Sequence, residues 1–425
     1  MPDVATSAPV AARSPMGLAW RKLRRHTLSL YGGLILAVLY LVMIFAEVLS
    51  PYLYSEGAKD KAYFWPTIIH WRDAEGRWTR PYIYNGYRLI DGDFREHYVE
   101  GRPENAALIA DRLRIPIEQV DTQKYPIRFF VRRGPPRKIW GLWESRWHFF
   151  GIQTEADRAW RPPATDAGGA GESGVASAAT EARNPPMLYL LGADHLGRDI
   201  LSRLLYGSRV SLTIGIVSVI ISFSIGMLLG GISGYFSGTT DVVIQRLCEM
   251  MMMVPGFYLL LALRSSFDAA KLSSTQIYFA VVIILSFIGW AGMARVIRGM
   301  VLGVSRSEYV LAARALGASN LRIIVRHVLP STLSYAIVTA TLAIPAGMLG
   351  ESGLSFLGLG IQDPEASWGN MLQQTMNIVN IRYYPWLLAP GFLIFVSVVA
   401  FQFLGDGLRD AFDPRTIVRA TKKRD

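Results

Sequence analysis

Six stretches of this 425-residue sequence are long and apolar enough to cross a membrane, and they limit the fold more than any other feature. A run of about 20 apolar residues spans the hydrocarbon core as a helix, because a helix satisfies its backbone polar groups without water. The sequence therefore predicts an all-α polytopic membrane protein with six transmembrane helices. The predicted spans are residues 28–50, 208–233, 243–263, 276–300, 331–358 and 385–405.

The first apolar run could also be read as a cleaved signal peptide. It is too long for the apolar region of such a peptide, however, and Pro51-Tyr52 does not resemble a cleavage site between small residues. We therefore expect a retained membrane helix after a cytoplasmic tail formed by residues 1–27. The mean hydropathy of +0.26 is mild for a membrane protein, so a polar portion must accompany the spans.

The formal charge of +11 collects at the ends of apolar runs. Residues 1–28 carry five basic side chains and one acidic one, residues 295–327 six and one, and residues 409–425 six and three. Basic flanks mark the cytoplasmic side of a membrane protein. This placement predicts that both termini and the loop near residue 310 are cytoplasmic, in a bacterial inner membrane. It also argues against nucleic-acid binding as the reason for the charge.

If the N-terminus is cytoplasmic, the first span ends on the outer side of the membrane. The long polar segment that follows this span is therefore expected on the outer side. Residues 51–160 are rich in aromatic residues and proline, with short apolar and polar alternations such as Tyr125–Val131. We expect a small α+β extracytoplasmic insertion between helices 1 and 2. Residues 161–190 have the Ala/Gly/Ser composition of a flexible linker, and residues 191–425 form the remaining transmembrane domain.

Two features inside the spans are candidates for specific roles. Gly226, Gly230 and Gly234 recur every fourth residue, which predicts a helix face that lets another backbone approach closely. Glu351 is ionisable within an apolar span, so it is a candidate pathway residue, although it could equally reach the outer interface.

We find no catalytic constellation, no metal-ligand spacing and no phosphate-binding loop, and therefore expect neither an enzyme nor a bound cofactor.

A cytoplasmic segment, residues 305–330, carries the most specific pattern. It reads Glu308-Tyr-Val-Leu-Ala-Ala-Arg-Ala-Leu-Gly317 and closes on Leu329-Pro330. A short helix with little side-chain bulk can lie in a groove of another protein, and Gly317 suits its C-terminus. The alternative is an amphipathic helix lying on lipid headgroups.

This segment resembles the EAA loop of ABC-importer permeases, in the form found in dipeptide, oligopeptide and nickel permeases. Leu311 and His327 depart from the usual glutamate and isoleucine of that loop. In that family the loop is a coupling helix that docks on the ATPase subunit. The resemblance implies ATPase coupling by Glu308, Ala312, Ala313, Arg314, Gly317, Ala318, Leu329 and Pro330.

Further segments are similar to the same family, including Leu191–Leu212, Leu354–Gly360 and Gly405–Arg415. The last of these resembles the second permease of the pair, the dipeptide-permease C type, here with an enlarged periplasmic loop. The resemblance implies a heterodimer with a second permease, two ABC ATPases that use ATP and Mg, a periplasmic substrate-binding protein and surrounding membrane lipid. The expected cargo is oligopeptides or related small solutes.

Two alternatives remain for the transported solute and the energy source. Relatives also carry oligosaccharides or other non-peptide solutes, and the sequence does not name the solute. An ion-driven secondary transporter would predict inverted repeats and charges near the middle of the spans, and the sequence shows no clear repeat and few such charges.

Overall fold

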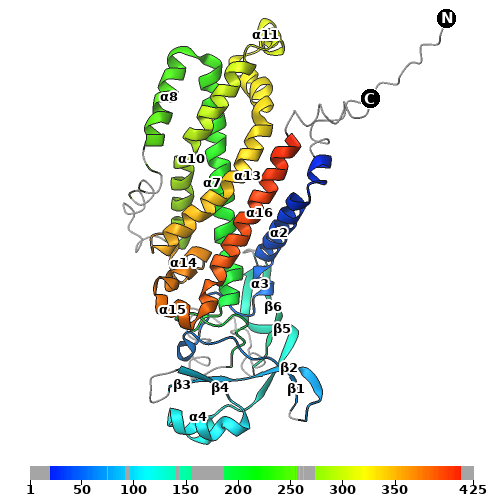
Figure 1. The fold of residues 1–425 in the computed structure, drawn as a ribbon, viewed down its shortest axis with the longest axis vertical. Coiled ribbons are helices and arrows are strands. Elements are labelled where there is room, and N and C mark those ends of the chain that lie inside the picture. The colour runs from blue at the N-terminus through cyan, green and yellow to red at the C-terminus, as the bar shows by residue number, and fades with distance from the viewer. Residues whose placement is uncertain are drawn as a thin grey trace, which may run out of the picture.

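The computed structural model describes residues 20–73, 75–90, 96–139, 143–154, 186–253, 273–412 and the single positions 255, 258 and 262. Within these ranges, five helices are long and apolar enough to cross a membrane. Five of the predicted spans are thereby confirmed as apolar helices of membrane-spanning length. These helices are α2 (Thr27–Ile44), α7 (Ile200–Phe236), α10 (Ser274–Val304), α13 (Leu329–Phe356) and α16 (Ala389–Phe412) (Figure 1).

The sixth predicted span, residues 243–263, overlaps helix α8 (Gly238–Met253). This helix has 16 residues, which is short for a crossing of the hydrocarbon core. Most of residues 254–263 lie outside the described part of the chain, so the sixth span stays a prediction.

Helix α7 runs through the middle of the bundle and contacts α10, α13 and α2, while α16 packs between α2 and α13. The helices approach one another most closely where one of them carries a small residue. An added Cβ at Gly32 of α2 would lie 2.6 Å from the carbonyl oxygen of Ala400 on α16. The start of α2, the end of α16 and helix α11 (Glu308–Ala315) all lie at one end of the bundle, at the top of Figure 1.

The strands lie at the opposite end of the molecule (Figure 1). Strands β1 (His70–Arg72), β2 (Trp78–Tyr84), β5 (Lys124–Ile139) and β6 (Trp143–Ile152) form an antiparallel sheet in the order β1-β2-β5-β6. Strands β3 (Gly86–Ile90) and β4 (Glu96–Glu100) form a separate antiparallel pair. Helix α4 (Ala106–Leu113) packs on this pair and buries Ile109 against Tyr87 and Leu89. We call residues 51–152 the strand domain.

The strand domain enters and leaves the bundle at one place. The short helix α3 (Ala46–Leu49) follows α2 and leads to Tyr52, which is fully buried. The backbone N–H of Leu188, on the returning chain, donates to the Tyr52 hydroxyl at 2.6 Å. The Tyr52 N–H in turn donates to Ser202 Oγ of α7 at 3.2 Å. These bonds fasten the outgoing and returning chain to the N-terminal end of α7.

Lys61, in the strand domain, is buried without an ion pair at short range among the described residues, and its ammonium donates to Asn85 Oδ1 at 2.7 Å. Burial lowers its pKa to about 7, partly offset by Asp121 and Asp60. The unfolded chain then binds more protons than the native state between pH 7 and the ordinary lysine pKa. Stability should rise with pH in this window.

We expect the free energy of unfolding of the strand domain to increase by roughly 1 kcal/mol per pH unit from pH 7.5 to 9.5. Denaturant titrations of the purified protein at several pH values, followed by tryptophan fluorescence, measure this slope. Lys61→Met removes the titrating group, so it should flatten the profile in this range. Equal slopes for both proteins would contradict the assignment of the pH dependence to Lys61.

Candidate functional site

Helix α11 and the turn that follows it pack against one end of the bundle. Val310 is fully buried and packs with Tyr235 of α7 and Val301 of α10. The Arg314 guanidinium lies 5.1 Å from the centre of the Tyr235 ring. The Tyr235 hydroxyl donates to Asn320 Oδ1 at 3.0 Å, at the start of α12 (Asn320–Ile323). One tyrosine of α7 therefore contacts both ends of the loop.

The loop reverses direction at Gly317 in a left-handed conformation, with φ of +78°. The Gly317 N–H donates to the Arg314 carbonyl at 3.0 Å, and the Ala318 N–H donates to the Ala313 carbonyl at 3.1 Å. This pair of bonds is the Schellman arrangement that ends a helix at a glycine. An added Cβ at Gly317 would meet nothing within 4 Å. The glycine is therefore favoured by the left-handed backbone conformation and not by a lack of space for a side chain.

Apolar side chains are exposed at this turn, and we call them the tip surface. Leu316 is 87 % exposed, and Leu321 is 63 % exposed. Tyr309 and Leu311 are about half exposed on the same short helix. Isolated exposed leucines are ordinary on a protein surface, but a cluster at a projecting turn indicates a contact with a partner. The tip surface comprises Tyr309, Leu311, Leu316 and Leu321.

The structure brings most of the predicted coupling residues together around this turn. Glu308, Ala312, Arg314 and Gly317 are exposed on α11 and its C-terminus, whereas Ala313, Ala318 and Leu329 pack against the buried cluster beneath. Pro330 lies in the first turn of α13, at some distance along the chain from the tip. Their coupling role stays a prediction. The exposure of the apolar tip residues was not predicted from the sequence, because a leucine gives no local sign of its exposure.

The three glycines of α7 face α10. An added Cβ would lie 2.8 Å from the Trp290 carbonyl oxygen at Gly226 and 2.8 Å from the Arg298 carbonyl oxygen at Gly234. At Gly230 it would overlap the Ala294 carbonyl oxygen and lie 3.0 Å from the Ala294 Cα. The backbones of α7 and α10 are thus in contact along this face, so the two helices move as one unit.

An ionic cluster lies at the end of the bundle nearest the strand domain, where Asp194, Arg198 and Arg203 are buried and Asp363 is 43 % exposed. Arg198 donates to Asp194 Oδ2 at 2.7 Å and to Asp363 Oδ1 at 2.8 Å, and Arg203 donates to Asp363 at 3.0 Å. Burial opposes ionisation of Asp363, but the hydrogen bond from Arg198 and the charge of Arg203 outweigh it and lower the pKa of Asp363. The cluster joins the start of α7 to the loop before α14 (Trp368–Leu372).

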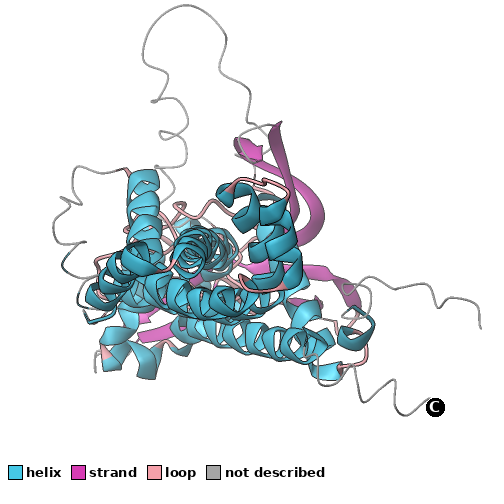
Figure 2. Ribbon diagram, turned by 90° about the horizontal axis from the view of Figure 1, so that it is seen from above, coloured by secondary structure: helices cyan, strands magenta, loops and turns pink. Residues whose placement is uncertain are grey.

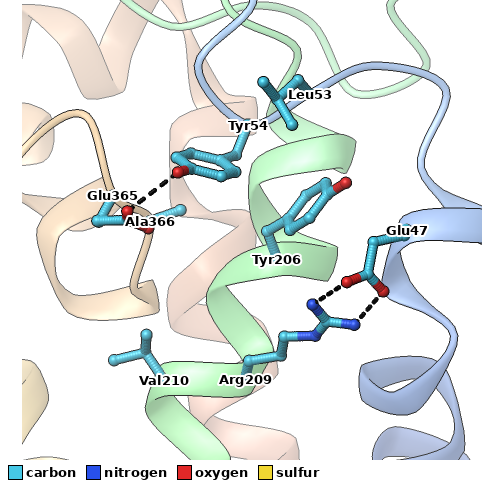
Figure 3. Close-up of a pocket in the computed structure, with 8 residues that line it drawn as sticks. All are labelled: Glu47, Leu53, Tyr54, Tyr206, Arg209, Val210, Glu365 and Ala366. Carbon is cyan, nitrogen blue, oxygen red and sulfur yellow. Dashed lines mark hydrogen bonds and ion pairs between the residues drawn. The ribbon is translucent and has the colours of Figure 1, made fainter. Parts of the chain in front are cut away.

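A pocket of about 400 Å³ lies beside this cluster, between α3, α7 and the residue 365 loop (Figure 3). Arg209 forms a bidentate ion pair with Glu47, and the Tyr54 hydroxyl donates to Glu365 at 3.0 Å. Each charged side chain of the lining in Figure 3 thus has a partner within the lining. The pocket is a junction between the first helix and the rest of the bundle.

Glu351 is fully buried in α13. Ser355 donates to its carboxylate at 2.7 Å, and Ser211 of α7 lies 3.4 Å away. Trp368 of α14 donates its backbone N–H to the same Ser211 at 3.0 Å. The carboxylate therefore joins three helices in this conformation and lies on no open surface. A pathway role for Glu351 stays a prediction.

Comparisons with known proteins agree with this architecture. A family model described as the binding-protein-dependent transport system inner membrane component matches residues 226–418. A model of the N-terminal transmembrane domain of oligopeptide transport permease C matches residues 14–66. Between the two matches lie residues 67–225, which include strands β1 to β6 and most of α7.

Similar relatives are found in several bacteria. The dipeptide transport system permease protein DppC of Bacillus subtilis is 40% identical over 57% of this chain and 73% of its own length. The oligopeptide transport system permease protein OppC of the same organism is 36% identical over 54% and 73%. OppC of Haemophilus influenzae is 39% identical over 53% and 70%. This chain belongs to the family of binding-protein-dependent transport system inner membrane components, among the permeases related to DppC and OppC.

Proposed function

We propose that this chain forms one half of the translocation pathway of an ATP-driven importer for oligopeptides or related small solutes. The tip surface on α11 carries the proposal, because it offers exposed leucines at the one turn that resembles a coupling helix. Peptide cargo is supported by the dipeptide and oligopeptide transport systems to which the relatives DppC and OppC belong. Oligosaccharides or other non-peptide solutes are the alternative cargo.

Force would pass from the tip into the bundle through rigid contacts. Val310 and Tyr235 connect α11 to α7 and α10, and the close backbone contact at Gly230 keeps those helices together. Asp241 of α8 accepts two hydrogen bonds from Arg298 of α10, at 2.6 and 2.5 Å. A displacement of α11 would therefore move α7, α8 and α10 as a rigid body, which is how packed helices transmit a switch.

The proposed assembly contains a second permease, two ATPase subunits that bind ATP and Mg, and a periplasmic substrate-binding protein. This chain would bind no cofactor of its own. Its termini and α11 would face the cytoplasm, because basic residues lie at that end of the bundle, before α2 at residues 21–25 and in the last turn of α16 at Arg409. The strand domain, within residues 51–160, would then lie in the periplasm, where a binding protein delivers its solute.

Co-purification in mild detergent tests the coupling proposal. We expect the tagged chain to retain its ATPase subunits, and the double variant Leu316→Glu/Leu321→Glu to lose most of them, because burying a carboxylate in an apolar contact is costly. Ile117→Glu is a matched control, since Ile117 is 60 % exposed in the strand domain. Retention of the ATPases by the double variant at the wild-type level would exclude the tip as the docking site.

A further inference from the structure

The β5–β6 hairpin has a fixed height relative to the membrane. Helix α2 has 18 residues and so is about 27 Å long, close to the thickness of the hydrocarbon core. Strand β6 packs on α3, which directly follows α2. The His148 ring Nδ1 lies 2.7 Å from the carbonyl oxygen of Ser50, at the end of α3. The middle of β6 therefore lies at the level of the headgroups.

The inner face of the hairpin is fastened to the bundle. Val131 and His148, which oppose each other across the two strands, are both buried. The Arg133 guanidinium lies 4.1 Å from the centre of the Tyr52 ring and donates to Glu56 at 3.0 Å. Seen along the bundle in Figure 2, the long curved hairpin extends beyond the outline of the helices. The other face is thus held outward, beside the bundle.

That outer face is aromatic. Phe129 and Phe130 are each 64 % exposed, and Trp147 is 45 % exposed. Phe149 contacts both phenylalanines edge to face, at centroid distances of 5.7 and 5.6 Å. Ile44 and Phe45, at the end of α2 just before α3, are also about half exposed. Aromatic side chains at the level of the headgroups are typical of a membrane interface.

The hairpin is also basic, unlike the remainder of its segment. Residues 124–152 contain seven Lys/Arg and one Glu, whereas the rest of residues 51–190 contains 13 basic and 17 acidic side chains. Arg128 and Arg132 are exposed, and the Arg132 guanidinium lies 4.4 Å from the centre of the Trp147 ring. Such a mixture of cations and aromatic rings suits anionic phospholipid headgroups.

We propose that the outer face of the β5–β6 hairpin binds the surface of the bilayer through anionic phospholipid. The binding residues are Arg128, Phe129, Phe130, Arg132, Trp147 and Phe149. The aromatic side chains enter the interface, and the arginines pair with phosphate groups above it. The hairpin thereby ties the strand domain to the bilayer beside α2. This inference depends on the membrane position of α2 and not on the identity of the solute.

Spin-label accessibility in nanodiscs tests the proposal on the assembled transporter. Cys248 is the single cysteine of the chain, so Cys248→Ser supplies a background, with cysteine-free partner subunits. A label at Phe130→Cys reports the hairpin, and a label at Leu108→Cys on α4, where Leu108 is 48 % exposed, is the control. Oxygen concentrates in lipid and a nickel chelate in water, so their accessibility ratio reports membrane contact.

With phosphatidylglycerol in the disc, we expect the ratio of oxygen to nickel accessibility at position 130 to exceed that at position 108 several-fold. It should fall in discs of phosphatidylcholine alone. Each arginine near an anionic surface favours the bound state by about fivefold, so Arg128→Gln/Arg132→Gln should lower the ratio in phosphatidylglycerol discs. Those three results support the lipid assignment.

Three outcomes would overturn it. A label at position 130 that meets the nickel chelate as freely as the label at position 108 would place the hairpin in water. A label at position 130 that is shielded from both reagents would place it against protein, either the second permease or the binding protein. An accessibility ratio at position 130 that is equal in discs with and without phosphatidylglycerol would show that the hairpin does not bind anionic headgroups.

Discussion

Gly317→Asp is expected to reduce solute uptake to the background of cells without the transporter, while the protein remains in the membrane. Gly317 lies at the turn of the loop with a left-handed backbone, directly beside the most exposed leucine of the tip surface. An aspartate there adds a charge to an apolar contact, and the charge must lose its water when a partner binds. Uptake of a labelled peptide in cells, with immunoblots of the membrane fraction, measures both quantities.

Gly317→Asn is the matched control for this experiment. Asparagine has the size of aspartate and tolerates the left-handed region about as well, so it keeps the backbone and omits the charge. We expect this variant to retain a large part of the uptake. Normal uptake by Gly317→Asp would exclude a docking role for the turn, whereas equal loss in both variants would assign the effect to the backbone.

Gly230→Leu is expected to prevent the bundle from assembling. An added Cβ at this position overlaps the backbone of Ala294 on α10, and a backbone cannot rotate away as a side chain can. The helices would have to separate, which removes the contacts at Gly226 and Gly234 as well. Overpacking of this kind costs about 3 kcal/mol or more. We expect a large loss of protein from the membrane fraction and a lower melting temperature in detergent.

Gly292→Ala on α10 is the corresponding control. An added Cβ at Gly292 meets nothing within 4 Å, and alanine favours a helix over glycine by about 1 kcal/mol. This variant should melt at or slightly above the wild-type temperature. A wild-type melting temperature for Gly230→Leu would show that the contact between α7 and α10 in this structure does not hold the bundle together.

The apolar spans could be predicted because length and hydropathy are properties of one continuous segment. Their ends were less predictable. Helix α7 begins at Ile200, eight residues before the predicted 208. Asp199 caps the helix there, and Arg203 is paired with Asp363. Similarly, α16 continues to Phe412, past the predicted 405. A charged residue ends a span in a hydropathy profile, although a partner elsewhere in the chain can keep it inside the helix.

The ionic cluster around Asp363 and the β5–β6 hairpin depend on contacts between distant parts of the sequence, which no local pattern contains. Asp363 meets Arg198 and Arg203 across more than 150 residues of sequence. The alternation at Tyr125–Val131 indicated a strand, but the register that pairs Val131 with His148 follows from the tertiary structure. Gly317 and the glycines of α7 were predictable, because glycine requirements are read from spacing and helix ends. The coupling role of Gly317 was suggested by resemblance, whereas the packing role of the α7 glycines was suggested by their spacing.

The bonds that join Tyr52 to Leu188 and Ser202 have a consequence for evolution and engineering. The outgoing and returning chain meet at the N-terminal end of α7, so the intervening segment is inserted at a single position. Its further contacts with the bundle are made by side chains, such as the hydrogen bond from the Tyr384 hydroxyl to Glu96 at 2.9 Å. A short turn could bridge Tyr52 and Leu188 without moving any transmembrane helix. The same junction should accept a reporter domain in exchange, provided that the termini of the reporter lie close together.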